Sequence, residues 1–276
     1  MGGAEQDPPD PRWENWWHNR VDSGMQQIER YGVMDYDSAA IYGIGGRARL
    51  GGKFYLSVAT PNEGNNPSND DGTYWIEDRA PGQNVMVFSR AGITEWTVPA
   101  VLRLGLRTAS VHVIGAGGGG GKRSDRAAAG GGGGGIAEGM VDLSGVSSVP
   151  VTVGARGEGG SGSSRESGLR GGNSSFGRYM SATGGGGGST ETPGSGGIGS
   201  GGDINTSYGP GEGSAVTGST AYAGGGGGPG GGGQNSDPVN MGLPGNPALG
   251  PGGGGGGSVG NFSGGPGYNG TVIVRW

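Results

Sequence analysis

The sequence predicts a mainly β chain with a short N-terminal helix. A small three-stranded β-module follows the helix, and a larger domain then combines β-strands with a bundle of polyglycine-II helices. Three observations predict this fold: a helical stripe of apolar residues near the start, short β-type segments punctuated by turn residues, and 75 glycines, of which only 14 precede residue 115. The predicted domains are residues 1–32, 33–80 and 81–276.

The N-terminal helix is predicted from apolar residues that recur every three or four positions, one face of an amphipathic helix. Pro11 suits the first helical position and Gly32 a C-terminal stop. The helix packs either on its own domain or on copies of itself, and we expect the second, with three copies. The candidate oligomer-interface residues are Trp13, Trp17, Val21 and Ile28.

Short strands are predicted between residues 33 and 114, because β-type side chains alternate there with Gly pairs and polar turns. The first group, within 33–80, contains Tyr42, Tyr55 and Trp75 and forms the β-module. A second group begins the larger domain. Its candidate strands are Asn84–Ser89, Thr94–Val98 and Leu102–Ile114.

Glycine dominates the chain after Ile114, in runs such as Gly117–Gly121 and Gly130–Gly135. The runs do not follow a strict Gly-X-Y pattern, so a collagen helix is not expected. Polyglycine-II helices lying side by side could satisfy one another's backbone groups, because only glycine lets backbones approach so closely. A disordered linker is the alternative. The closing segment Thr271–Trp276 favours order, because it reads as a strand that needs a partner, and residues 111–114 are the natural one.

The loops between the runs are the expected binding surface, because they can vary without disturbing the packed glycines. The longest are Lys122–Ala129, Asp203–Ala223 and Gln234–Pro251. The candidate binding residues in these loops are Lys122, Arg123, Tyr208, Tyr222, Asn235 and Met241.

Composition argues against several other functions. The net charge is −5, so nucleic acid is not an expected partner. Cysteine is absent, which removes disulfides and thiolate metal sites. No apolar run approaches the ~20 residues of a membrane span, and no signal peptide precedes the helix, so membrane insertion is not expected.

Catalytic motifs are also missing. The glycines after Gly115 match a dinucleotide-binding pattern, but no helix follows them and the match is almost automatic in polyglycine. His18 and His112 are the only histidines, one in the predicted helix and one in a strand, so a shared metal site or catalytic triad is not expected. We therefore expect no enzyme activity, no cofactor and no metal.

Several pieces of the larger domain occur in a fixed order, from Trp96-Thr-Val-Pro99 and Val111–Gly121, through Asn173–Gly177, to the final Gly267–Trp276. Through these pieces the domain resembles the glycine-rich C-terminal domain of phage tail fibres. The resemblance implies a fibre tip on the phage tail of the virion. Related adhesins pack polyglycine-II helices in layers and bind receptors through distal loops.

Residues 36–78 resemble the small three-stranded carbohydrate-binding module of chitinases, through Gly52-Lys-Phe-Tyr55, Asn62–Ser68 and Trp75. In that family exposed aromatic rings stack on sugars. The positions that match are Tyr42, Tyr55 and Trp75, and these rings either bind sugar or pack in the core.

These resemblances imply a phage tail-fibre protein that attaches to a bacterial surface receptor, a polysaccharide or an outer-membrane protein, and to other phage tail proteins, and we expect it to be trimeric. The alternative is a structural tail or baseplate component that never contacts a receptor. A free ice-binding protein is a third possibility, against which the long irregular loops argue.

Overall fold

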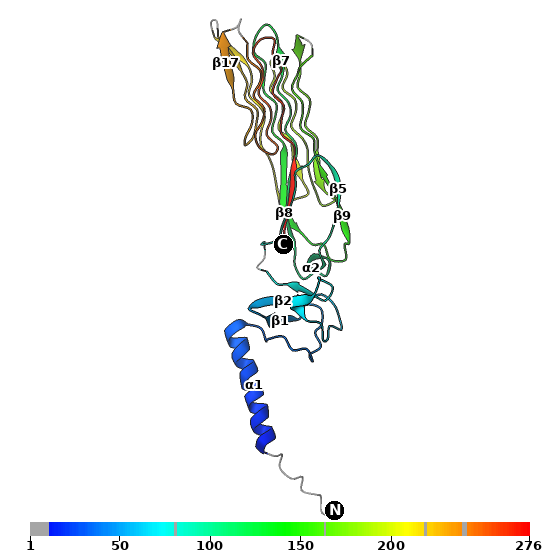
Figure 1. The fold of residues 1–276 in the computed structure, drawn as a ribbon. Helices are drawn as coiled ribbons and strands as arrows, with labels where there is room; N and C mark the ends of the chain where they lie inside the picture. Colours follow the sequence, from blue (N-terminus) through cyan, green and yellow to red (C-terminus); the bar gives the residue numbers. More distant parts are fainter. Residues whose placement is uncertain (1–10, 80–81, 163, 218–219, 239–241) are drawn as a thin grey trace, which may run out of the picture. The chain divides into compact units, whose positions relative to one another are not determined.

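The computed structural model describes residues 11–79, 82–162, 164–217, 220–238 and 242–276 (Figure 1). The chain divides into two compact units, Met1–Ala80 and Pro81–Trp276. Strands account for 30% of the residues and helices for 11%, so the predicted mainly β class with a short N-terminal helix is confirmed.

The first unit begins with α1, Pro11–Tyr31, as the apolar spacing predicts. Gly32 ends the helix: its φ is 70°, and its N–H donates to the Ile28 carbonyl across 2.7 Å. A left-handed residue directly after the last helical turn is most easily a glycine.

The remainder of this unit is a three-stranded antiparallel sheet in the order β1-β2-β3. Its strands are β1 Arg47–Leu50, β2 Lys53–Ser57 and β3 Trp75–Glu77. Gly51 and Gly52 have φ of 59° and 80° and join β1 to β2 in a two-residue hairpin that needs positive φ at both positions. A one-turn 3-10 helix, Pro67–Asn69, lies in the loop before β3.

The second unit is built on two five-stranded sheets. One has the order β14-β8-β6-β18-β4 and the other β13-β12-β11-β9-β5. The strands of the first are β4 Val85–Phe88, β6 Ala109–Ile114, β8 Gly135–Val141, β14 Ile204–Ser207 and β18 Thr271–Arg275. Those of the second are β5 Gly92–Thr97, β9 Ser148–Val153, β11 Ser174–Phe176, β12 Met180–Ala182 and β13 Gly199–Ser200.

The hydrophobic core of the second unit lies between these two sheets. Alternate residues of β6 and β9 are buried, including Val111, Val113 and Val151. The rings of Trp96 and Phe176 pack with centroids 5.8 Å apart. The predicted pairing of the closing strand is confirmed, because β18 pairs antiparallel with β6 and places Val274 opposite Val111.

One predicted strand is wrong in part. The segment Leu102–Ile114 is a strand only from Ala109 onward, whereas Ala100–Arg103 forms the short helix α2. Val101 and Leu102 are adjacent and both buried, which a helical turn allows and an alternating strand does not. Gly105, with φ of 69°, follows this turn.

Between β6 and β18 the chain forms the glycine bundle, the set of parallel and antiparallel glycine-rich segments that run away from the two sheets (Figure 1). The first run shows how they are ordered. Gly115, Gly118 and Gly121 donate to the carbonyls of Gly135, Gly132 and Ala129, on one neighbouring segment. Ala116 and Gly119 donate to a second segment, at Gly172 and Leu169, and Gly117 and Gly120 to a third, at Tyr268 and Gly265.

Each neighbour is thus met every third residue, which is the repeat of a polyglycine-II helix. Three further segments donate to the carbonyls of the same run, from Gly157 and Gly160, from Gly185 and Gly188, and from Gly255 and Ser258. Six neighbours therefore surround the first run, and its N–H and C=O groups are paired without a conventional sheet.

Close approach, rather than unusual φ, is what requires glycine here. None of the residues Gly117–Gly121 has a positive φ. A Cβ built on Gly117 would collide with the backbone carbonyl of Gly253, and one on Gly120 with that of Gly256. Any side chain would push the packed backbones apart, as the sequence predicts.

Candidate functional site

The end of the glycine bundle opposite the two sheets gathers several short connections, here called the loop end (Figure 1). It contains a two-stranded sheet of β7, Lys122–Arg123, and β10, Arg165–Glu166. It also contains a three-stranded sheet of β15 Ala215–Thr217, β16 Thr220–Ala223 and β17 Asn235–Pro238. The loop 189–192 lies beside them.

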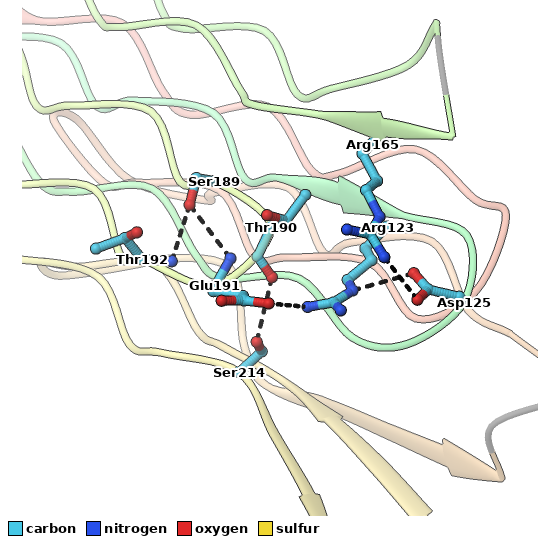
Figure 2. A network of polar contacts seen from close by, with 8 residues as sticks. All are labelled: Arg123, Asp125, Arg165, Ser189, Thr190, Glu191, Thr192 and Ser214. Atoms are coloured by element: carbon cyan, nitrogen blue, oxygen red, sulfur yellow. Dashed lines mark hydrogen bonds and ion pairs between the residues drawn. The ribbon is translucent and has the colours of Figure 1, made fainter.

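Arg123 is the central side chain of the loop end, and Figure 2 shows its contacts. It is only 5% exposed. Its Nε donates to Oδ1 of Asp125 across 3.0 Å, and its Nη1 donates to Oε1 of Glu191 across 2.7 Å. Arg165 Nη2 donates to the other carboxylate oxygen of Asp125 across 2.9 Å. This network, called the Arg123 network below, joins three connections that are far apart in the sequence.

The loop that presents Glu191 is itself ordered by local hydrogen bonds. Ser189 Oγ accepts the backbone N–H groups of Glu191 and Thr192, at 3.2 and 2.8 Å. The hydroxyl of Ser214 donates to the Thr190 carbonyl across 3.4 Å, which brings the segment before β15 to the same loop (Figure 2). A fourth connection is therefore tied to the network.

Lys122 has a similar bracing role on the other side of β7. It is 6% exposed, and its Nζ donates to the Ser161 carbonyl across 3.1 Å. The Glu166 carboxylate accepts the backbone N–H groups of Ser161 and Gly162. Hydrogen bonds with both Lys122 and Glu166 thus fix the loop that leads to β10.

A small apolar cluster underlies the three-stranded sheet. Its members are fully buried and small, and they are Ala127, Ala221, Ala223 and Val259. Tyr222 lies between two of them on β16 and points the other way, since neighbouring strand residues alternate between faces. Tyr222 is 41% exposed. The loop end therefore presents an aromatic ring on a sheet whose other face packs on this apolar cluster.

The charges of the network affect its protonation. The hydrogen bond from Arg123, against a smaller opposing effect of burial, holds the pKa of Asp125 below its ordinary value, and Arg165 contributes in the same direction. Asp125 is therefore ionised at neutral pH and accepts from both guanidinium groups.

The six predicted receptor-binding residues do not share one environment. Tyr222 is exposed at the loop end, whereas Lys122 and Arg123 lie there but are buried and brace the loops. Asn235 begins β17, and Met241 lies outside the described residues.

Tyr208 lies elsewhere, near the sheets, where its N–H donates to the Gly134 carbonyl. Its ring is half-buried against the bundle, where Cβ atoms on Gly228 and Gly252 would come within 3.1 Å of it, and desolvation raises its pKa. Tyr208 therefore fills space between sheet and glycine segments.

The carbohydrate-binding candidates come together in the core of the β-module. Trp75 is 2% exposed, and Tyr55 is buried with it. The Tyr42 ring packs edge-on against Trp75 with centroids 4.8 Å apart, and the indole N–H donates to the Asn65 carbonyl across 2.8 Å. Of the two roles that the sequence left open for these rings, the structure shows packing.

The oligomer-interface candidates all lie on α1. Trp13, Trp17 and Ile28 are exposed and Val21 is half-buried, so this stripe has no cover within the described part of the first unit.

Sequence reasoning missed three members of the Arg123 network: Asp125, Arg165 and Glu191. Each lies in a short polar interruption between glycine segments and has no periodic pattern around it. The available signal was charge, because these interruptions carry opposite signs: Lys122-Arg123 in one, Glu191 in another.

These features define a class of protein: a mainly β chain whose larger unit is a polyglycine-II bundle with ordered loops at one end. A family model described as a glycine-rich domain matches residues 89–276. The match covers more than half of the chain, and the chain belongs to this family. No match was found among curated proteins.

None of the helices in the described residues has the length and apolar character needed to span a bilayer. Among the same residues, no cluster of three or more His, Asp or Glu side chains is arranged to bind a metal ion.

Proposed function

We propose that this chain is a phage tail-fibre adhesin that attaches the virion to a bacterial surface receptor through the loop end of its glycine bundle. The observation that supports this most is the Arg123 network. A buried arginine that binds two carboxylates from different loops fixes the shape of a surface that is otherwise made of short connections. Ordered loops lose less conformational entropy when they bind a partner.

The glycine bundle supports the same proposal. Its backbone N–H and C=O groups are paired with one another, so few of them can bind other molecules. Its packing also does not depend on the sequence of the loops. Binding residues are commonly carried on loops held by such a rigid scaffold. Attachment to other phage tail proteins would then leave the loop end free to meet the receptor, either a polysaccharide or an outer-membrane protein.

Tyr222 is the residue through which we test this proposal. Aromatic residues are enriched among those that dominate binding energy at interfaces. The matched control is Tyr268, which is 39% exposed but lies beside the start of the first glycine run, where Gly117 donates to its carbonyl. The two rings have almost equal exposure at different ends of the bundle.

The experiment measures binding of purified chain to intact bacterial cells and to cells stripped of surface polysaccharide. We expect Tyr222→Ala to weaken binding at least tenfold and Tyr268→Ala to leave it unchanged, with both variants melting as the parent does. Loss of binding on stripped cells would identify a glycan receptor. Equal binding of both variants would exclude Tyr222 from the contact, and no binding to any candidate host would favour a structural tail component.

A further inference from the structure

Strand β4 forms one edge of the first five-stranded sheet of the second unit, because only β18 pairs with it. Directly before β4, Asn84 and Trp276 exchange two backbone hydrogen bonds, of 3.3 and 3.1 Å. Hydrogen-bonded pairs alternate with non-bonded pairs along an antiparallel ladder. Met86 is therefore bonded to β18, whereas the N–H and C=O groups of Val85 and Val87 point away from it.

These outward backbone groups of Val85 and Val87 have no hydrogen-bond partner among the described residues. The two side chains are also open, since Val85 is 49% exposed and Val87 is 54% exposed. Ile273 lies opposite Val87 on β18 and extends the apolar row on the same face of the sheet. Residues Val85–Phe88, here called the β4 edge, thus offer backbone donors and acceptors beside an apolar surface.

The other three edge strands of the two sheets have features that hinder the addition of a further strand. Strand β13 has only two residues, and β14 is polar from Asn205 to Ser207. Strand β5 carries the exposed Glu95. Short edges and charged side chains are common protections against strand pairing. The β4 edge contains no charged residue and no proline, so it lacks these protections.

The charges around the β4 edge are mainly positive. Arg275 lies opposite Val85, and it lines a hollow of about 530 Å³ together with Arg107. Arg90 follows the other end of β4 by two positions and is exposed. Residues 82–94 and strand β18 contain no acidic residue, and Glu95 belongs to the other sheet. The surroundings of the edge therefore favour a partner that carries negative charge.

We propose that the β4 edge is a docking site for an extended segment of another protein, which adds to the sheet as a sixth, antiparallel strand. The outward groups of Val85 and Val87 each gain a hydrogen-bonded partner in this arrangement. Main-chain bonds supply affinity in strand addition, and alternate side chains supply specificity. The segment places apolar residues opposite the two valines, and an acidic residue near its C-terminal end lies on the side of Arg275.

Charge argues against a second copy of this chain as the occupant. Two β4 edges paired antiparallel would bring Arg90 of each copy toward the Val85 end of the other, where Arg275 and Arg107 lie. Like charges would then meet at both ends of the pairing, which is destabilising. A foreign segment with a carboxylate brings the opposite sign to the same place.

This inference goes beyond the proposed adhesin function. It concerns an edge of the sheets, whereas the proposed receptor surface is the loop end of the glycine bundle. The experiments below use no receptor and no cells, so they fail or succeed independently of receptor binding.

The first test follows amide hydrogen exchange of the full chain by NMR, with and without a capped peptide of sequence Thr-Val-Thr-Val-Thr-Glu. Paired antiparallel, its valines lie opposite Val87 and Val85, and its glutamate lies at the Arg275 end. We expect millimolar peptide to slow exchange of the Val85 and Val87 amides about fivefold or more. The amides of Met86 and Phe88, already bonded to β18, are internal controls and should change little. Unchanged exchange at both valines would overturn the proposal.

A second peptide, with lysine in place of the glutamate, tests the role of charge. We expect it to bind about tenfold more weakly at low salt, and the difference between the peptides to shrink as salt screens the charges. The variant Arg275→Gln should reduce that difference while the chain melts as the parent does. Equal binding of the two peptides to the parent chain would contradict an acidic partner.

Substitutions at Val87 test whether the peptide binds at the β4 edge. Val87→Pro removes an N–H that the fold itself does not use, and proline is tolerated at such edge positions. We expect it to melt as the parent does and to lose peptide binding. Val87→Lys, which keeps the N–H and adds an edge charge, is the second variant and should weaken binding about tenfold.

The matched control is Ile93→Lys on β5, where the side chain is 75% exposed at the edge of the other sheet. We expect this variant to bind the peptide as the parent does. Parent-like binding by both Val87 variants would overturn the proposal. Slowed exchange at Val85 and Val87 that grows with protein concentration, without peptide, would also overturn it and assign the β4 edge to a second copy.

Discussion

Arg123 Nη1 donates a 2.7 Å hydrogen bond to Glu191 Oε1 and so joins two loops that are 68 positions apart in the sequence. The same guanidinium binds Asp125 through Nε. The arginine is buried, whereas the side chains of Asp125 and Glu191 are 47% and 72% exposed. Removing the arginine would therefore leave two exposed carboxylates, whereas removing both carboxylates would leave a buried guanidinium.

That difference predicts an asymmetric response to substitution. Arg123→Met keeps an apolar stem and leaves two carboxylates that water can solvate, so we expect a small loss of stability. The double variant Asp125→Ala, Glu191→Ala leaves a buried guanidinium without its partners. We expect it to cost more, though less than the roughly 3–5 kcal/mol typical of fully buried pairs. Calorimetric melting of both variants checks this, and a larger loss for Arg123→Met would contradict it.

Acid should loosen the Arg123 network. The folded-state pKa of Asp125 lies below its ordinary value, mainly because of Arg123. The stability that this group contributes is therefore fully present above the unfolded value of about 3.9 and is lost as pH falls through the folded value.

We expect the melting temperature of the parent chain to fall below about pH 4, and Asp125→Asn to show a weaker dependence over the same range. Melting curves from pH 2.5 to 6 measure the difference. Identical pH profiles for the two proteins would show that Asp125 does not contribute in this way.

Substitutions at different glycines of the glycine bundle should differ sharply in their effect on stability. A Cβ on Gly226 would collide with the backbone carbonyl of Gly254, whereas a Cβ on Gly233 would meet only the side-chain nitrogen of Asn246, at 3.7 Å. We expect Gly226→Ala to cost roughly 1–3 kcal/mol, with a larger loss for Gly226→Val. Gly233→Ala should be neutral or slightly stabilising. Equal melting temperatures for the two alanine variants would contradict the close packing.

Trp75 should stabilise the β-module. It is fully enclosed and its indole N–H is paired, so Trp75→Ala should cost roughly 3–5 kcal/mol of the module's stability. Phe54 on the same sheet is 36% exposed and is the matched control, with an expected change below about 1 kcal/mol. Near-ultraviolet circular dichroism during melting follows the aromatic cluster. Unchanged melting of Trp75→Ala would favour a binding role for the ring instead.

Local chemistry made several elements predictable. The spacing from Trp13 to Ile28 predicts α1, and Gly32 predicts its end. The apolar residues of Thr271–Trp276 predict a strand that needs residues 111–114 as its partner. The glycine runs predict polyglycine-II packing, because few other conformations pair backbone groups in uninterrupted glycine.

Other features depend on contacts that sequence does not display. Leu102 belongs to a helical turn in which Val101 and Leu102 are both buried, and the burial of two adjacent residues depends on tertiary packing that the sequence does not display. Tyr208 lies against the sheets rather than at the loop end. The path of the chain between β6 and β18 decides at which end of the glycine bundle each loop lies, and the sequence does not display that path. The members of the Arg123 network come from three connections, and nothing near any one of them indicates the other two.

The threefold repeat of hydrogen bonds has a consequence for how this chain can vary in length. A run that gained or lost one glycine would rotate every later N–H in that run toward a different neighbour, because successive residues point to different segments. A change of three would restore every pairing and only lengthen or shorten the bundle by one turn. Insertions and deletions that survive in such runs should therefore come in threes, or in matched changes on facing runs.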